Sequence, residues 1–387
     1  MHRKLRLGMI GGGHGAFIGA VHRIAARMDN EYDLVCGSFS SNPQVSASSG
    51  KDLGIAEPRV YATYQQLFET EKTLPADIRV EVISIVTPNH AHFEPAKLAM
   101  ENGFHVVMDK PITLTLAEAR ELERISADTG MLFCLTHTYT GYPMVKEARQ
   151  IIISGKLGEV RKVYVEYPQG WLSTPLENTG QKQAEWRSDP KRNGPGGALG
   201  DIGTHAFNMA EYISGLKVRQ LCADINKVVT GRQLDDDANV LLKFDNGASG
   251  ILFATQIAAG EENNIKVRVY AENGGLEWQQ NDANTLTIKW LDKPAEILRA
   301  GGNVTYLSSF ALHNCRTPGG HPEGYLEAFA NHYRNFALTI KAKQAREKAA
   351  PEWLDYPGIE EGVRGMAFIE TAIASGLSAN KWLELKL

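Results

Sequence analysis

Apolar runs of strand length alternate with amphipathic helical patterns in the first third of the chain. The runs cover Leu5–Ile10, Leu34–Phe39, Val82–Thr87 and His105–Met108, and helical periodicity follows the first and the third. Such alternation predicts parallel strands, because a crossover helix returns the chain to lie parallel in the same sheet. Aliphatic side chains fill most of the third run, which is typical of a strand that helices cover on both faces.

The pattern changes after about Tyr139, where hairpin signals replace crossover helices. The segments Asn239–Phe244 and Ala248–Ala254 are joined by an Asp-Asn-Gly turn, and Asn-Gly supplies the positive φ angles of a tight hairpin. In Ile265–Ala271 apolar and polar side chains alternate, which is typical of a strand covered on one face only. This part of the chain is therefore predicted to be α+β, with a mostly antiparallel open sheet.

The length of 387 residues suits two domains, since single domains usually hold about 100–200 residues. We expect the first domain to span residues 1–138 and the second to span residues 139–387, beginning with a helical stretch at Met144–Ile153. Two more helical patterns, Tyr325–Ala342 and Gly362–Ala374, lie near the C-terminal end, and spacing alone does not assign them to a domain.

A glycine-rich turn joins the first predicted strand to the first predicted helix. It reads Gly-x-Gly-x-x-Ala from Gly11 through Gly13 to Ala16, and it also contains His14 and Gly15. Gly11 permits a tight turn, Gly13 lets the backbone approach a pyrophosphate, and the small Ala16 lets the helix pack on the strand. Free N–H groups at the start of the helix attract phosphate oxygens. The turn therefore predicts an NAD(P)-binding Rossmann domain.

The end of the second strand is expected to lie beside the adenosine ribose, and it carries hydroxyl groups where an acid is usual. Ser40 and Ser41 are the candidate contacts, while Glu31 and Asp33 precede the predicted strand. No arginine stands at this end to pair with a 2′-phosphate. The cofactor is therefore predicted to be NAD or NADP, with NAD preferred.

Two further segments carry residues suited to acid–base chemistry. Lys110 follows the fourth strand, at the carboxyl edge of the sheet where α/β domains bind ligands, although a lone lysine there is more often a surface residue. Asp201 and His205 lie four residues apart after a run of glycines, so they share one helix face. An imidazole beside a carboxylate suits proton transfer near neutral pH; a helix-start acid next to an unrelated histidine is the structural alternative.

The composition and charge of the chain limit the kinds of binding partner that are expected. The chain is 43% hydrophobic and 22% charged with a formal net charge of -4, and no block of like charge suggests nucleic-acid binding. Its apolar runs fall short of the roughly 18 residues of a membrane span, and the basic start lacks a secretory apolar core. We therefore expect a cytoplasmic protein that binds neither nucleic acid nor membrane.

The positions of cysteine, histidine and aspartate do not suggest a metal site. The four cysteines lie far apart, without the C-x-x-C spacing of a zinc site. His90 and His92 are two residues apart, but no carboxylate or cysteine spacing supports them as ligands. The run Asp235–Asp237 is interpreted as an exposed acidic turn, with cation or hydroxyl binding as the alternative. No metal is predicted.

Four ordered motifs resemble the Gfo/Idh/MocA family, which includes glucose-fructose oxidoreductase and inositol dehydrogenase. They are the glycine turn, the loop Thr87–His90, Asp109-Lys110-Pro111 in place of the family's Glu-Lys-Pro, and the segment Gly197–His205. The resemblance covers essentially the whole chain. It implies an NAD(P)-dependent dehydrogenase that transfers a hydride between nicotinamide and a secondary hydroxyl or ketone of a sugar, glycoside or inositol.

The resemblance also implies roles for individual residues. Lys110, Asp201 and His205 would form the catalytic group: His205 as the base, Asp201 orienting it, and Lys110 stabilising the alkoxide. Further residues implied as cofactor contacts are Thr87, Pro88, Asn89, His90, Asp109, Lys110, Trp186 and Arg187. Residues expected to line the substrate are Tyr139, Gln169, Trp171 and Lys182.

Alternatives exist for several of these residues and for the protein as a whole. Asn89 suits a helix cap, and Trp186 with Arg187 suits a stacked pair in a surface loop. One branch of the family is an NAD-dependent, redox-neutral glycosidase, and one relative is a sugar-pathway regulator without turnover, against which the intact catalytic group argues. Relatives pair through the open sheet, so a homodimer or homotetramer is expected.

Overall fold

The computed structural model describes residues 3–387, which divide into two compact units. The first unit comprises the chain up to Thr113 together with Ala117–Thr138 and Phe329–Val363. The second unit comprises Leu114–Leu116, Tyr139–Ala328 and Arg364–Leu387. The predicted domain ranges differ from these units chiefly in residues 329–363, which pack with the first unit.

The first unit is built on a five-stranded, all-parallel sheet in the order β2-β1-β3-β4-β5. Its strands are β1 (Leu5–Gly11), β2 (Tyr32–Ser38), β3 (Val82–Val86), β4 (His105–Met108) and β5 (Phe133–Leu135). Its helices are α1 (Phe17–Met28), α2 (Pro43–Asp52), α3 (Tyr64–Glu71), α4 (Phe93–Glu101), α5 (Leu116–Thr129) and most of α11 (Tyr325–Ala345). The predicted Rossmann sheet is therefore confirmed.

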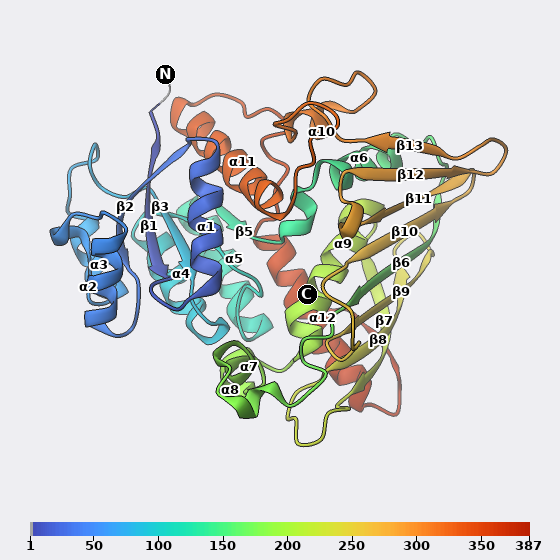
Figure 1. Ribbon diagram of the computed structural model, residues 1–387, viewed down its shortest axis with the longest axis horizontal. Coiled ribbons are helices and arrows are strands. Elements are labelled where there is room, and N and C mark those ends of the chain that lie inside the picture. Colours follow the sequence, from blue (N-terminus) through green and yellow to red (C-terminus); the bar gives the residue numbers. More distant parts are fainter. Residues whose placement is uncertain (1–2) are drawn as a thin grey trace. The chain divides into compact units, whose positions relative to one another are not determined.

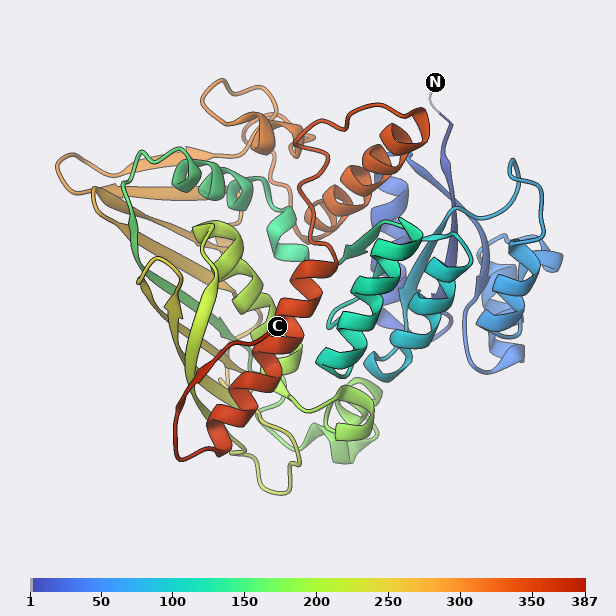
Figure 2. The ribbon, with the colours of Figure 1, turned by 180° about the vertical axis from the view of Figure 1, so that it is seen from behind.

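Helices cover both faces of this sheet, which explains its continuous apolar strands. All five residues of β3 are buried. Figure 1 shows α1 and α11 on one face, and Figure 2 shows the helices α4 and α5 on the other. A central parallel strand in this position has no side that faces water, so an alternating polar pattern would be unfavourable.

A buried polar cluster explains why α11 belongs to the first unit. Tyr333 on α11 places its hydroxyl 2.7 Å from His22 Nδ1 and 2.9 Å from Ser84 Oγ, which come from α1 and β3. Burial lowers the pKa of His22 to about 4, so the ring is neutral. The hydroxyl of Tyr32 also donates to the carbonyl oxygen of Tyr333, at 2.9 Å. Sequence spacing could not show this, because α11 lies far from β1–β5 along the chain.

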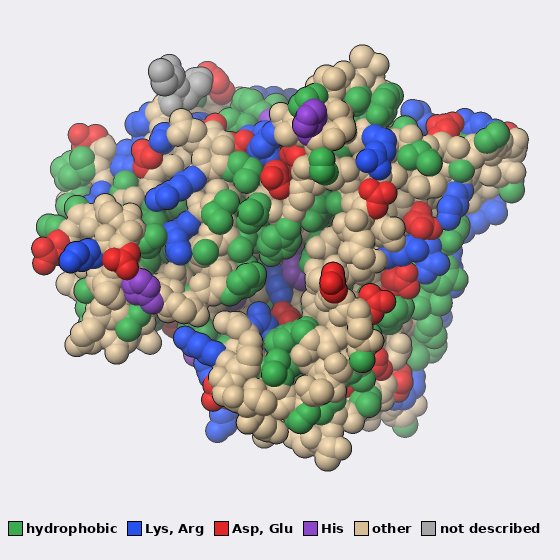
Figure 3. Space-filling view, viewed as in Figure 1, with side chains coloured by type: hydrophobic (Ala, Val, Ile, Leu, Met, Phe, Trp, Pro, Cys, Tyr) green, Lys and Arg blue, Asp and Glu red, His purple; other side chains and the backbone are tan. Residues whose placement is uncertain are grey.

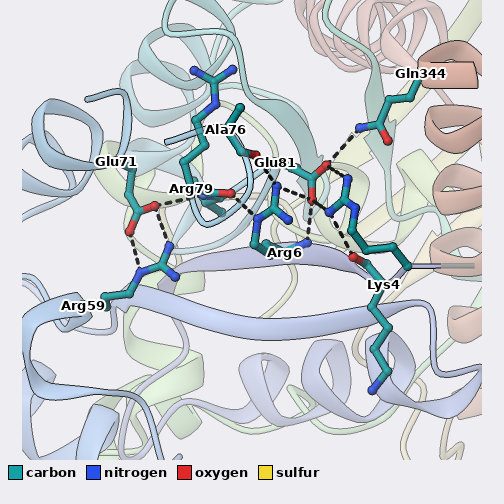
Figure 4. A network of polar contacts seen from close by, with 10 residues as sticks. Lys4, Arg6, Arg59, Glu71, Ala76, Arg79, Glu81 and Gln344 are labelled. Atoms are coloured by element: carbon teal, nitrogen blue, oxygen red, sulfur yellow. Dashed lines mark hydrogen bonds and ion pairs between the residues drawn. The ribbon is translucent and has the colours of Figure 1, made fainter. Parts of the chain in front are cut away.

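A second polar network centres on Glu81, just before β3 (Figure 4). Its carboxylate accepts hydrogen bonds from the guanidinium of Arg3, from the backbone N–H of Arg6 at 3.0 Å and from Gln344 Nε2 at 3.0 Å. Burial acts to raise the pKa of Glu81, but these donors outweigh it and the pKa is lowered. The network joins β1, β3 and the end of α11.

The second unit is built on a nine-stranded sheet in the order β13-β12-β11-β10-β6-β9-β8-β7-β14. Only β6 and β9 pair in parallel; the other neighbours are antiparallel, so the predicted mostly antiparallel sheet is confirmed. The strands are β6 (Val160–Pro168), β7 (Val218–Asn226), β8 (Asp237–Phe244), β9 (Ser249–Thr255), β10 (Lys266–Ala271), β11 (Gly274–Gln279), β12 (Thr285–Trp290), β13 (Glu296–Arg299) and β14 (Trp382–Glu384). The helices are α6 (Pro143–Ile153), α7 (Lys182–Arg187), α8 (Pro190–Asn193), α9 (Thr204–Ser214), α10 (Ser309–His313) and α12 (Ile359–Leu377), the last of which begins in the first unit.

One face of this sheet is covered by helices, and the other is largely polar. Alternate residues of β8 are buried, as the pattern of a strand with one covered face predicts. The outer face carries ion pairs, among them Lys266 with Glu277 at 3.2 Å and Lys289 with Glu277 at 2.8 Å. Figure 3 shows basic and acidic side chains interspersed over the visible surface, in keeping with the small net charge of -4. Among residues 3–387, no helix is long and apolar enough to cross a membrane.

Candidate functional site

The glycine turn lies between β1 and α1, and its backbone requires glycine. Gly11, Gly12 and Gly15 have φ angles of +84°, +73° and +76°, a region that other residues rarely adopt. The N–H of Gly13 donates to the carbonyl oxygen of Phe39 at 2.9 Å, and a Cβ atom on Gly13 would lie 2.7 Å from that oxygen. The turn is thus held against the end of β2, the region where an adenosine ribose binds in Rossmann folds.

The start of α1 offers N–H groups that no side chain caps. Ala16 is the N-cap residue, and its side chain accepts no hydrogen bond. Uncapped N–H groups at a helix start, reached through a glycine-rich turn, fit a pyrophosphate. The closest approach of helix and turn lies at Gly19, where a Cβ atom would be 2.4 Å from Gly12 Cα. Gly19 therefore contributes to the close packing that the sequence motif assigned to Ala16.

Polar residues near the end of β2 lie at or near the surface. Ser40 is half-buried and its Oγ accepts from the N–H of Asn42 at 3.1 Å, while Ser41 is exposed. The imidazole of His14 is about half exposed and lies 3.1 Å from Asp52 Oδ2. Both serines are therefore accessible to a ribose at this position.

Two loops at the carboxyl edge of the parallel sheet are joined by a buried histidine. His92 Nε2 lies 2.9 Å from the carbonyl oxygen of Thr87, and Nδ1 lies 2.8 Å from that of Pro111. Sequence reasoning considered His92 only as a metal ligand and missed this position. The predicted cofactor contacts on the loop after β3 are half-buried Thr87 and Pro88, buried Asn89 and exposed His90.

The aspartate before Lys110 supports the backbone of that lysine. Asp109 Oδ1 accepts from the N–H of Lys110 at 2.9 Å and from Thr136 Oγ1 at 3.3 Å. The shorter acid in place of the family's glutamate therefore has a defined local role. Burial, together with the positive charges of Lys110 and His332, lowers the pKa of nearby His137 to about 3. A neutral His137 adds no positive charge beside Lys110.

In the second unit, a buried carboxylate holds the glycine run that leads to Asp201. Asp235 is 6% exposed and accepts from the N–H groups of Gly197 at 2.6 Å and Leu199 at 2.7 Å. Asp236 is 1% exposed and accepts from two backbone N–H groups and from Arg232. The prediction of an exposed acidic turn is therefore wrong. Both carboxylates are buried because they satisfy donors that these loops leave unpaired.

Asp201 and His205 lie in consecutive helical turns. Asp201 belongs to a π-helical turn at Leu199–Gly203, and His205 to the first turn of α9. Single π-turns within helices occur frequently at functional sites. His205 is only 8% exposed, and the side chain of Asp201 is 14% exposed.

Amide side chains connect Asp201 to a neighbouring loop. Asp201 Oδ2 accepts from Gln256 Nε2 at 2.9 Å and from Arg187 Nε at 3.3 Å. Gln256 Nε2 also donates to Gln169 Oε1 at 3.2 Å, and the same oxygen accepts from Trp171 Nε1 at 3.0 Å. The predicted substrate residues Gln169 and Trp171 thus share one network with Asp201.

Two tyrosines and an asparagine close a ring of hydrogen bonds beside His205. Tyr167 donates to Asn263 Oδ1 at 2.8 Å, Asn263 Nδ2 donates to the oxygen of Tyr139 at 3.3 Å, and the two tyrosine hydroxyls contact each other. The oxygen of Tyr167 therefore accepts the proton of Tyr139. Burial raises the pKa of both tyrosines. The ring of Tyr139 meets His205 edge to face, with centroids 5.0 Å apart.

Arg187 lies between the two predicted indole contacts. Its guanidinium carbon is 4.2 Å from the ring centroid of Trp186 and 5.9 Å from that of Trp171. These distances place a stacked cation beside Asp201. Lys182 is exposed at the start of α7 and has no hydrogen bond to this network within residues 3–387.

The predicted site residues thus gather in two groups, one in each unit. The first unit holds the glycine turn, the two serines, the loop after β3 and Lys110. The second holds Asp201, His205, Tyr139 and the indole and amide side chains. Sequence reasoning missed Tyr167, Gln256 and Asn263, which no local motif marks. In the described part of the chain, no three His, Cys, Asp or Glu side chains lie so that they could hold a metal ion.

A parallel sheet with a glycine-rich turn between β1 and α1, joined to an α+β unit with a mostly antiparallel sheet, is the organisation of a family of nicotinamide-dependent oxidoreductases. Comparison with protein families agrees. The model described as "Oxidoreductase family, NAD-binding Rossmann fold" matches residues 5–137, and that described as "GFO/IDH/MocA C-terminal domain" matches residues 145–277. The chain belongs to the Gfo/Idh/MocA family of oxidoreductases.

Full-length relatives support this assignment. The uncharacterized oxidoreductase YfiI of Bacillus subtilis is 33% identical, over 99% of this chain and 98% of its own. The crystal structure of an oxidoreductase from Sinorhizobium meliloti is 43% identical with a TM-score of 0.88, covering 99% of this chain and 100% of that one. An inositol dehydrogenase homolog from Azotobacter vinelandii, solved with NAD+, is 32% identical with a TM-score of 0.92, covering 99% and 98%. The same homolog has also been solved with NADH and myo-inositol, with a TM-score of 0.89.

Proposed function

We propose that this protein is an NAD(P)-dependent dehydrogenase that oxidises a secondary hydroxyl of a sugar, glycoside or inositol, or reduces the corresponding ketone. The observation that carries the proposal is the setting of Asp201: Gln256 and Arg187 hold it one helical turn before His205. A carboxylate and an imidazole one helical turn apart can together move the proton of a hydroxyl group.

His205, Asp201 and Lys110 divide the proton chemistry among them. His205 removes the hydroxyl proton, since an unprotonated imidazole nitrogen accepts a proton. Asp201 orients the imidazole and stabilises its protonated form. Lys110 stabilises the alkoxide that develops on the substrate oxygen. The nicotinamide, when bound, supplies the acceptor for the hydride.

The first unit would hold the cofactor through the glycine turn and the loops at the carboxyl edge of the sheet. Gly11, Gly13, His14, Gly15 and Ala16 surround the uncapped start of α1, which suits the pyrophosphate. Further contacts follow from the family pattern: Ser40, Ser41, Thr87, Pro88, Asn89, His90, Asp109 and Lys110 from this unit, and Trp186 and Arg187 from the other.

We favour NAD over NADP. After Ser38 the first cationic residue is Lys51, so the chain places no arginine or lysine directly after β2. A 2′-phosphate is normally met by such a cation. Titration with both cofactors tests this preference, and tighter binding of NADP would overturn it.

The substrate proposed is a small hydroxyl-rich ring. Gln169 and Trp171 present an amide and an indole to the region beside Asp201, with Tyr139 at His205. Indole faces and amides suit the apolar faces and hydroxyl groups of such a ring. The Azotobacter vinelandii homolog has been solved with myo-inositol, which makes inositols the first compounds to test. Lys182 remains a proposed contact from α7.

We further propose a cytoplasmic homodimer or homotetramer. A row of paired residues crosses the uncovered face of the second sheet: Trp382, Cys222, Leu241, Ile251 and Tyr164. Leu241 is 45% exposed and Trp382 is 37% exposed. Burying such a row against a second copy removes apolar surface from water.

The decisive experiment is a turnover assay. Purified protein would be incubated with NAD or NADP and a panel of inositols, aldopyranoses and glycosides, and reduced nicotinamide followed by its absorbance. We expect turnover with a polyol and a loss of about 100- to 10,000-fold in His205→Ala, with cofactor binding retained. Glycoside cleavage without net reduction would instead show a redox-neutral glycosidase. Cofactor binding without turnover of any compound would favour a regulator.

A further inference from the structure

We propose that Gln256 is a positioning residue that holds Asp201 and links it to the loop beginning at Gln169. The proposal rests on the dehydrogenase function, because it assigns to Asp201 a role in orienting His205. Gln256 itself is not placed against the substrate; it acts through the two side chains to which its amide donates.

The backbone of Gln256 is anchored on both sides. Gln256 follows β9 directly, and β9 lies between β6 and β8 near the middle of the nine-stranded sheet. Its N–H donates to the carbonyl oxygen of Asp236 at 2.9 Å, and its own carbonyl oxygen accepts from the N–H of Leu172 at 3.1 Å. The residue is 2% exposed. The side chain therefore projects from a fixed position.

The carboxamide of Gln256 has one favourable orientation. Its two N–H groups meet two acceptors, Asp201 Oδ2 at 2.9 Å and Gln169 Oε1 at 3.2 Å. A carboxylate oxygen accepts only, and Gln169 Oε1 is an acceptor that also takes the N–H of Trp171 at 3.0 Å. Turning the amide over would set its oxygen against both acceptors. The geometry therefore uses both donors of a single nitrogen.

Arg187 also donates to Asp201, but its guanidinium has other partners. Arg187 lies on α7, a helix of six residues, and its Nε is 3.3 Å from Asp201 Oδ2. Its guanidinium is shared with Gln183 Oε1, at 2.7 Å, and with the ring of Trp186. Gln256 also fixes the carboxylate without adding a positive charge. Gln256 therefore adds no positive charge that would compete with a protonated His205 for Asp201.

Gln169 connects this support to the predicted substrate loop. Its N–H donates to the carbonyl oxygen of Thr255, the last residue of β9, at 2.8 Å. Its side-chain oxygen accepts hydrogen bonds from Gln256 and Trp171, and its side-chain nitrogen donates one to Asn263. A substrate bound against Trp171 would influence the orientation of Asp201 through the hydrogen-bonded amides of Gln169 and Gln256. Orientation errors of this kind are costly, since a small misplacement of a reacting group lowers the rate about 100-fold.

The test replaces Gln256 by methionine, which keeps the length of the side chain and removes both donors. The matched control is Gln220→Met on β7 of the same sheet, outside the network. We expect kcat of Gln256→Met to fall about 10- to 100-fold with KM and NADH affinity unchanged, and its primary deuterium isotope effect to rise because the chemical step becomes more limiting. Wild-type kcat, or a rise in KM alone, would overturn the proposal. If the methionine variant does not fold, Gln256→Glu is used in its place, because it also removes both N–H donors.

A crystal structure of the variant decides the proposal independently of turnover. We expect the carboxylate of Asp201 to leave its present position and the indole of Trp171 to lose its place on Gln169. An unchanged position of the Asp201 carboxylate would refute the positioning role. If the wild-type protein oxidises no polyol with either cofactor, the proposed function fails, and the structural comparison still shows whether Gln256 holds Asp201.

Discussion

His92 Nδ1 lies 2.8 Å from the carbonyl oxygen of Pro111, so the loop after β4 is tied to the start of α4 by a buried side chain. The other ring nitrogen lies 2.9 Å from the carbonyl oxygen of Thr87. Burial lowers the pKa of His92, although Asp109 and both carbonyl oxygens favour the charged ring. One residue thus joins the two loops for which cofactor contacts are proposed.

Replacing His92 by leucine should weaken cofactor binding. The leucine fills the space but removes both polar contacts, so the loops at Thr87 and Pro111 lose their common support. We expect NADH affinity, measured by fluorescence titration, to fall about 10-fold, the equivalent of about 1.4 kcal/mol. His321→Leu, at an exposed histidine, is the matched control. Equal affinity in both variants would show that the two loops keep their positions without His92.

Gly197, just before the π-helical turn, and Gly200, within it, should respond in opposite ways to the same substitution. A Cβ atom on Gly197 would lie 2.0 Å from the carbonyl oxygen of Asp235, whereas one on Gly200 meets no atom within 4 Å. We expect Gly197→Ala to destabilise the protein by about 1–3 kcal/mol and to displace Asp201, with loss of turnover. Gly200→Ala should be neutral or stabilising by up to about 1 kcal/mol, since alanine favours a helical turn. Thermal unfolding and turnover of both variants check this, and similar behaviour would contradict it.

The stability of the first unit should depend on the ionisation of Glu81. Its pKa in the folded protein lies below the ordinary value of 4.5, because the donors from Arg3, Arg6 and Gln344 outweigh burial. A lowered pKa means that the carboxylate stabilises the fold above about pH 4.5 and that this contribution is lost as the pH falls through the folded pKa.

Glu81→Gln isolates this contribution. We expect the variant to be less stable by about 1–2 kcal/mol at neutral pH, and the difference from wild type to shrink in acid. Urea unfolding at several pH values measures it. Glu57→Gln, at an exposed glutamate of the same unit, should follow the wild-type curve. A difference that stays constant with pH would show that the charge of Glu81 is not what stabilises the network.

Placing a charge on the outer face of the second sheet should disrupt self-association. Leu241→Lys sets an ammonium in the middle of the row that runs from Trp382 to Tyr164. We expect a shift toward monomer in analytical ultracentrifugation, because an unpaired charge in a buried interface is costly. Leu291→Lys is the control, since Leu291 is 80% exposed and lies outside this row. An unchanged sedimentation profile of Leu241→Lys would move the proposed interface elsewhere.

Local patterns predicted most of the fold. The expected strands at Leu5–Ile10 and His105–Met108 correspond to β1 and β4, and the hairpin around Asn246-Gly247 corresponds to β8 and β9. The three-residue β5 was not among the predicted strands, because so short a run has no readable period. Asp235 was misread, because burial of a carboxylate depends on distant N–H groups that its neighbours do not reveal.

The two architectures and the family follow from local patterns in the chain, since hydrophobic period, turn chemistry and short motifs are local properties. Lys110, Asp201 and His205 each lie within such a motif. The side chains that surround them depend on the folded structure. Gln256 donates to Asp201 from 55 positions away, and Asn263 reaches Tyr139 across 124. In each pair a residue of a helical turn meets a residue of the loop between β9 and β10, so the contact depends on how helices and sheet pack in the whole unit.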